Sequence, residues 1–123
     1  MYAHIGLHVR DLDAAVRFYE AVLLPLGHRL AARDDASASF GPADDPALYL
    51  YLDPARRSAG SGTHIALRAH QQSGVRSFHE RGLAAGGKEN GAPGIRADYG
   101  PNYYAAFLLD PDGNNLEAVC NSA

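Results

Sequence analysis

The sequence predicts an α+β fold built from two copies of one strand–helix–strands unit. Residues 4–11 (HIGLHVRD) and 64–71 (HIALRAHQ) share an alternation of apolar and polar side chains. This alternation is typical of strands that have one face against a core. The match continues downstream at the same separation: Phe18, Glu20, Leu23 and Gly27 recur as Phe78, Glu80, Leu83 and Gly87. The whole unit is therefore duplicated.

In the first unit, a helix is expected to follow the opening strand. Asp11 is placed to cap it, and apolar residues recur at three- and four-residue spacings from Leu12 to Leu26. Pro25 and Gly27 end the helix. A strand hairpin is expected over residues 28–40, a turn-rich loop over 41–46 and a strand over 47–52.

In the second unit, the helix is predicted over residues 73–85, weakened by Gly74 and Gly82. Residues 88–100 are rich in glycine and proline and are interpreted as mostly loop around a short strand. Strands are expected over residues 102–109 and 115–120. The turn between them, Asp110-Pro-Asp-Gly113, has Pro second and Gly fourth.

Length and composition predict one domain over residues 1–123. The repeat divides this domain into a first module over about 1–56 and a second over about 62–123. The chain is 46% hydrophobic, which is enough to build a core. Residues 53–62 are the only stretch that reads as a linker. A net charge of −3 gives no basic footprint for nucleic acid, so we expect no nucleic-acid partner.

The sequence has no apolar run long enough for a membrane span and no signal-peptide pattern, so no membrane partner is expected. The single cysteine, Cys120, has no partner for an intrachain disulfide. Together these features predict a cytoplasmic protein. Cys120 is interpreted as a buried structural residue, and His28, His70 and His79 are interpreted as surface residues.

The order of elements resembles the vicinal oxygen chelate superfamily, whose members include glyoxalase I, extradiol dioxygenases, fosfomycin-resistance enzymes and bleomycin-binding proteins. The resemblance rests on the two His-Ile-Gly/Ala-Leu openings, on Phe18-Tyr19, and on the closing Asp-Pro-Asp-Gly-Asn-Asn-Leu-Glu117. It covers essentially the whole chain. It implies two tandem βαβββ modules that form a cupped mixed sheet with helices on its outer face.

The resemblance also implies one divalent metal ion, such as Fe, Mn, Zn, Ni or Co, held by His4, His64 and Glu117. Such a set of two histidines and one carboxylate leaves open positions on the ion. Substrate oxygens then bind the metal directly and become polarised. The alternation within each strand puts each of the three residues on the face opposite its aliphatic neighbours, which favours the set.

Metal-binding glyoxalase I uses a fourth ligand, a glutamate on the last strand of its first half. The matching window here is Tyr49-Leu50-Tyr51, with Leu50 as the best match, and it contains no carboxylate. This difference makes glyoxalase I chemistry the less favoured reading. It leaves ring-cleaving oxygenation and Lewis-acid isomerisation, lysis or epoxide opening as alternatives.

Further candidate residues fall into two groups. Tyr103 or Tyr104 is a candidate proton donor. Candidate substrate-binding residues lie on the polar strand faces and in the loop of residues 90–102: His8, Tyr49, Tyr51, Arg68, Arg96 and Asn102. The cationic members suit a carboxylate, phosphonate or phenolate oxygen. The competing structural interpretation is that His8 and Arg68 are solvent-exposed residues at strand edges. For the loop of residues 90–102, it is that the loop is an ordinary surface connection.

The favoured function is a metal-dependent enzyme acting on a small substrate that chelates through two neighbouring oxygens. The alternative is a non-enzymatic protein that sequesters a small molecule, as bleomycin-binding members of the superfamily do. The resemblance also implies a homodimer, in which His4 and His64 of one site come from one chain or from two.

Overall fold

The computed structural model describes residues 1–55 and 63–122 of the 123-residue chain. The predicted linker from residue 56 onward, and with it the boundary between the modules, lies outside the described residues. The first module contains β1 (Ile5–Val9), α1 (Leu12–Leu23), the short 3-10 helix η1 (Leu24–Leu26), β2 (Arg29–Arg33), β3 (Ser37–Gly41) and β4 (Leu48–Leu52). The second contains β5 (His64–Arg68), α2 (Gln72–Ala84), β6 (Lys88–Ile95), β7 (Tyr104–Leu109) and β8 (Asn115–Cys120).

Each module forms its own four-stranded mixed sheet. The strand order is β1-β4-β3-β2 in sheet 1 and β5-β8-β7-β6 in sheet 2. The opening strand of each module pairs in parallel with its last strand, and the other pairs are antiparallel. The predicted α+β fold of two βαβββ modules is confirmed, with the eight strands divided between two sheets.

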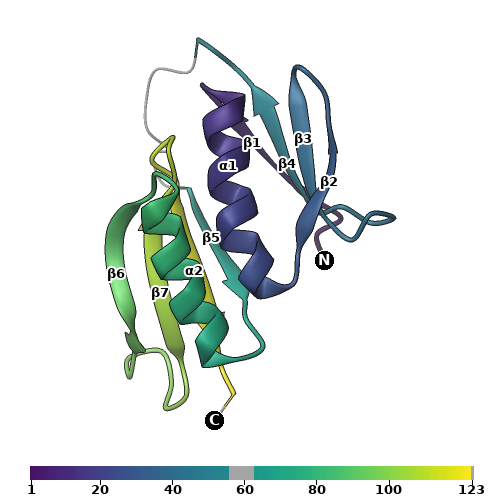
Figure 1. Cartoon of the computed structure of the whole chain (residues 1–123). Coiled ribbons are helices and arrows are strands. Elements are labelled where there is room, and N and C mark those ends of the chain that lie inside the picture. The colour runs from purple at the N-terminus through teal and green to yellow at the C-terminus, as the bar shows by residue number, and fades with distance from the viewer. Residues whose placement is uncertain (56–62, 123) are drawn as a thin grey trace.

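One helix covers one face of each sheet. Helix α1 packs on sheet 1, α2 packs on sheet 2, and the two helices pack against each other between the sheets (Figure 1). The N-terminus of α1 is capped as predicted, since the Asp11 carboxylate accepts the Ala14 N–H. Because the helices cover only one face, each sheet keeps an uncovered face, which we call the open face.

The hydrophobic core lies between helices and sheets. It takes the apolar side chains of alternate strand residues, such as Leu7 and Val9 of β1 and Leu116 and Ala118 of β8. Side chains at the intervening positions therefore lie on the open faces. This alternation decides which polar residues are available for chemistry.

Strand β6 is longer than the sequence predicts. Its pairing with β7 shifts register between Glu89 and Gly91 and again between Gly91 and Gly94. These irregularities accommodate the glycines that led us to expect a loop. Because β6 is an edge strand, Pro93 is also tolerated in it.

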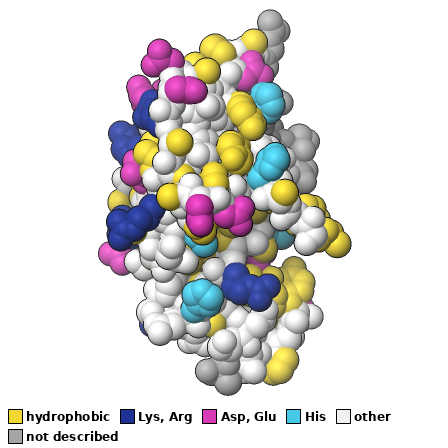
Figure 2. Space-filling view, turned by 90° about the vertical axis from the view of Figure 1, so that its right-hand side faces the viewer, with side chains coloured by type: hydrophobic (Ala, Val, Ile, Leu, Met, Phe, Trp, Pro, Cys, Tyr) yellow, Lys and Arg dark blue, Asp and Glu magenta, His cyan; other side chains and the backbone are white. Residues whose placement is uncertain are grey.

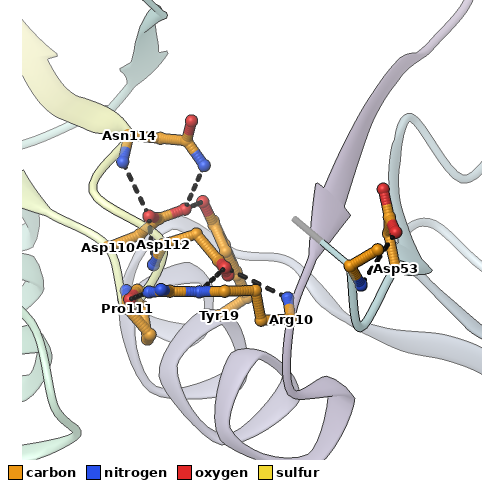
Figure 3. Close-up of polar contacts among 8 residues, drawn as sticks. Arg10, Tyr19, Asp53, Asp110, Pro111, Asp112 and Asn114 are labelled. Carbon is orange, nitrogen blue, oxygen red and sulfur yellow. Dashed lines mark hydrogen bonds and ion pairs between the residues drawn. The ribbon is translucent and has the colours of Figure 1, made fainter. Parts of the chain in front are cut away.

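The Asp-Pro-Asp-Gly turn between β7 and β8 joins the two modules (Figure 3). The buried Asp110 carboxylate accepts the backbone N–H groups of Asp112 (2.9 Å) and Asn114 (2.8 Å), which fix the turn. It also accepts the hydroxyl of Tyr19 on α1 at 2.5 Å. Arg10 donates its backbone N–H (3.0 Å) and its Nε–H (3.2 Å) to Asp112. The turn is thus held by residues of the first module.

No helix among the described residues is long and apolar enough to cross a membrane.

Candidate functional site

A compact polar cluster lies on the open face of sheet 2. Glu117 of β8 is 2% exposed, and its Oε1 atom is 2.7 Å from Nε2 of His64, whose side chain is 49% exposed. The hydroxyl of Tyr103 donates to the other carboxylate oxygen, Oε2. A buried carboxylate is costly unless it is hydrogen-bonded, and these two donors satisfy it.

Tyr103 is held in its protonated form by this arrangement. The hydrogen bond to Glu117, followed by burial, raises the pKa of the Tyr103 phenol to about 12. An anionic phenolate beside the carboxylate would repel it and lose the hydrogen bond. Tyr103 therefore serves as a hydrogen-bond donor at neutral pH.

The register of sheet 2 explains how the cluster forms. Glu117 lies opposite Ala66 of β5 and opposite Phe107 of β7. Alanine leaves space beside the carboxylate, and the ring of Phe107 lies 6.1 Å from that of His64. The sequence reasoning did not select Phe107, although strand alternation puts it on the same face as Glu117.

The open face of sheet 1 carries a row of imidazole and phenol rings. The His4 and Tyr49 rings meet edge to face at 5.1 Å, Tyr49 stacks on Tyr51 at 6.2 Å, and Tyr51 contacts His8 at 5.8 Å. Histidine and hydrophobic side chains gather side by side on this part of the surface (Figure 2). Nδ1 of His8 is 3.9 Å from Asp53 Oδ2, a contact that sequence spacing did not indicate.

The three predicted ligands are thus divided between two faces of one chain. His64 and Glu117 are paired on sheet 2, whereas His4 precedes β1 on sheet 1. Within residues 1–55 and 63–122, no three His, Cys, Asp or Glu side chains converge to hold a metal ion. One chain by itself therefore offers two of the three donors at one place.

The remaining candidates differ in position. Tyr104 lies on the helix-covered face, where the guanidinium of Arg76 is 5.9 Å from its ring centroid, so it is separated from Glu117 by the sheet. Arg68 is exposed on the open face of sheet 2, and Asn102 is exposed in the turn before Tyr103. Arg96 follows β6, and its guanidinium is 5.4 Å from the Phe107 ring centroid.

The sequence and the fold match a known family. The model of the glyoxalase/bleomycin resistance protein/dioxygenase superfamily matches residues 2–118. The chain belongs to this superfamily. The comparison with solved structures agrees, because a glyoxalase/bleomycin resistance protein from Albidiferax ferrireducens is 27% identical, with a TM-score of 0.84 and 98% coverage of both chains.

Two further solved structures carry the names of two different activities. A glyoxalase I variant from Zea mays is 27% identical with a TM-score of 0.74, and the alignment covers 96% of this chain and 46% of the maize chain. A bleomycin resistance determinant encoded on the transposon Tn5 is 25% identical with a TM-score of 0.66, covering 96% and 95% of the two chains. No curated protein matches this superfamily member.

Proposed function

We propose that this chain is a divalent-metal-dependent enzyme whose site is completed in a homodimer. His64 and Glu117 come from one protomer, and His4 comes from its partner. The observation that carries the proposal is the pairing of His64 with buried Glu117 on one open face while His4 lies exposed on the other. Two-fold pairing brings the open face of sheet 1 against that of sheet 2, and it does so twice.

The residues of the cluster fit a metal ion. Imidazole nitrogen and carboxylate oxygen are the donors that Fe, Mn, Zn, Ni and Co accept. The 2.7 Å between Nε2 of His64 and Oε1 of Glu117 is close to the separation of neighbouring ligands on one ion. Ligand distances of about 2.1 Å at a right angle give roughly 3 Å between ligand atoms. The ion would supply Lewis acidity toward two neighbouring oxygens of a substrate.

The protein side chains around the cluster have separate tasks in this proposal. Tyr103 holds the Glu117 carboxylate in place through its hydroxyl and stays protonated, and the lone pairs of the same oxygen can accept a hydrogen bond that orients a substrate hydroxyl. Phe107 shields one side of His64 from water. The imidazole and tyrosine rings of the partner's sheet 1 would form the opposite wall and bind the substrate.

The first module offers no carboxylate at the position of the fourth glyoxalase I ligand. Leu50 is 0% exposed and points into the core, while its neighbours on the open face are Tyr49 and Tyr51. A three-ligand site therefore supports dioxygenase, lyase, isomerase or epoxide-opening chemistry ahead of the glyoxalase I reaction.

A subunit-mixing experiment tests the shared site. His4→Ala and Glu117→Ala proteins are purified anaerobically, and bound metal is measured for each, for wild type, and for an equimolar mixture unfolded and refolded together. We expect each variant to lose its metal and the mixture to regain about a quarter of the wild-type content, because half the dimers are mixed and each has one intact site. Sedimentation should give twice the chain mass of 13.1 kDa.

Three results contradict the proposal. Negligible metal in the wild-type protein, or equal metal in all three proteins, removes the metal site. Loss of metal in both variants without recovery in the mixture places all three ligands in one chain and removes the shared site.

The second candidate function is binding and sequestration of a small molecule without catalysis. It is favoured by the stacked Tyr49 and Tyr51 rings on an open face and by the likeness to the Tn5 bleomycin resistance determinant. Bleomycin is the probe. Its affinity should survive both metal removal and His64→Ala if this function is correct, and should be absent if the enzyme proposal is correct.

A further inference from the structure

The guanidinium of Arg96 is fixed in place by the backbone of the strand that precedes it. Nη2 donates to the carbonyl oxygen of Ala92 at 2.7 Å, and Nη1 donates to that of Gly94 at 3.1 Å. A long side chain normally loses several rotamers when it binds a ligand. Arg96 has already lost this freedom, so it is pre-organised for binding.

The irregular pairing of β6 makes the room for this conformation. A Cβ on Gly91 would lie 2.8 Å from Cδ1 of Phe107 and 3.2 Å from Nη2 of Arg96, and Gly91 has a φ of +150° that favours glycine. A Cβ on Gly94 would lie 3.2 Å from Nη1. Bulges of this kind are over-represented beside active sites, where they redirect a side chain.

Arg96 borders the Glu117 cluster. Its backbone N–H donates to the carbonyl oxygen of Tyr103 at 2.8 Å, and the side chain of Tyr103 in turn donates to Glu117. Its guanidinium lies over the Phe107 ring, and this ring is next to His64. The cation is therefore one side chain away from both paired residues of the site.

Arg96 also has no counter-ion within the part of the chain that the structure describes. No carboxylate in residues 1–55 or 63–122 forms an ion pair with it. Two of the five guanidinium N–H groups are used by the backbone contacts, which leaves donors for a ligand. A fixed, partly buried cation with unused donors is a receptor for an oxyanion with two acceptor oxygens.

We propose that Arg96 is the anion receptor of the site and that the substrate is an anion. The carboxylate or phosphate group of the substrate binds Arg96. Two oxygens that neighbour each other in the substrate bind at the site formed by His64 and Glu117. This inference rests on the proposed function for the second half of that arrangement, but the anion site itself stands on the geometry of Arg96.

Binding of inorganic phosphate at constant ionic strength tests the receptor. Isothermal titration calorimetry is run on the full-length protein as purified and again after metal removal. We expect Arg96→Gln to weaken phosphate binding about tenfold or more, since hydrogen bonds to charged groups are lost. The phosphate affinity of Arg96→Lys should lie between those of wild type and Arg96→Gln, because lysine keeps the charge but not the planar fork.

Arg76→Gln is the matched control. Arg76 also lies over an aromatic ring, that of Tyr104, but on the helix-covered face. Its loss should leave phosphate affinity within about twofold of wild type, well below the effect of a lost charged hydrogen bond. Melting temperatures of all variants separate unfolding from loss of binding, and Arg96→Lys decides the matter if Arg96→Gln does not fold.

Three results overturn the receptor: no phosphate binding by wild type, unchanged affinity in Arg96→Gln, or full wild-type affinity in Arg96→Lys. Bound metal, measured in the same samples, separates this inference from the proposed function. If the wild-type protein contains no metal as purified but binds phosphate in an Arg96-dependent way, the anion site stands and the proposed metal site is removed. If the wild-type protein contains metal but phosphate binding does not depend on Arg96, the proposed metal site stands and the anion site is removed.

Discussion

At the residue scale, Glu89 shows how a strand irregularity fixes a surface carboxylate. Its Oε1 atom accepts the N–H of Gly91 at 2.8 Å, and Oε2 lies 2.8 Å from Nε2 of His79 on α2. The Gly91 N–H, with a smaller contribution from His79, lowers the pKa of the Glu89 carboxyl below its ordinary value of 4.5. Glu89 therefore connects the edge strand β6 to the helix that covers it.

The lowered pKa of Glu89 predicts a pH-dependent contribution to stability. Because the folded-state pKa lies below the unfolded one, the contribution is present above pH 4.5 and is lost as the pH falls through the folded value. Urea unfolding of wild type and Glu89→Gln should give a difference in unfolding free energy that narrows below pH 4.5.

The control for this measurement is Glu80→Gln on the exposed side of α2. The Glu80 side chain has no hydrogen bond or ion pair within the described residues. Its substitution should not change the shape of the curve. A Glu89→Gln difference that stays constant through acid pH would contradict the role of Glu89.

At the element scale, the two glycines of α2 have opposite roles that the sequence does not distinguish. A Cβ on Gly82 would lie 2.2 Å from Leu108 Cδ1 of β7 and 2.9 Å from Val22 Cγ1 of α1, so this glycine lets both elements approach the helix. A Cβ on Gly74 meets nothing nearer than 3.4 Å. Close packing of α2 therefore depends on Gly82 and not on Gly74.

We therefore predict opposite effects for two identical substitutions. Gly82→Ala should destabilise the protein by about 1–3 kcal/mol, because overpacking forces the core to shift. Gly74→Ala should be neutral or stabilising by up to about 1 kcal/mol, because alanine costs less backbone entropy in a helix. Thermal and urea unfolding followed by circular dichroism measures both, and equal effects would refute the packing role of Gly82.

At the scale of the whole molecule, the contact between the Asp110–Gly113 turn and the first module holds the two modules in one structure. Tyr19 and Arg10 belong to the first module, and the carboxylates that they contact belong to the second. Asp110 and Asp112 are both buried. This contact helps to orient the two open faces, which matters because the proposed site shared between protomers would use both.

Tyr19→Phe tests this contact. The ring should keep its packing against Phe18 and Phe40, so only the hydroxyl donor to buried Asp110 is lost. We expect a loss of about 1.5–3 kcal/mol in unfolding free energy, the usual contribution of a hydrogen bond to a charged group, since Asn114 Nδ2 still donates to the same carboxylate oxygen at 2.8 Å. Tyr2→Phe, at a side chain that is 78% exposed, is the control and should change nothing. Equal stability of the two variants would show that the hydroxyl contributes nothing.

Most of the fold follows from local patterns. The alternation in β1 and β5, the cap at Asp11 and the Asp-Pro-Asp-Gly turn each act within a few residues, and the structure contains all of them. The predicted length of β6 was wrong: the strand is longer than expected, because pairing at a sheet edge tolerates glycine and proline. The surface position expected for His79 was also wrong, since its side chain is 13% exposed and pairs with Glu89.

The candidate site is predictable only in part. Strand alternation is enough to put Glu117 and His64 on one face, and the parallel register of β5 and β8 brings them together. Strand alternation does not show that His4 lies on a separate sheet, because the division into two sheets depends on how the modules pack. The position of Arg96 depends on bulges in β6, which have no simple sequence signature.

Sequence alone was sufficient to predict two βαβββ modules, the polar face of each strand, and the superfamily that the chain resembles. These features follow from periodicities of two and 3.6 residues, which are local properties of the backbone. Only the tertiary structure decided that Tyr103 rather than Tyr104 meets Glu117, and that His4 lies apart from His64. Such contacts depend on register and on packing between modules, which join residues far apart in the chain.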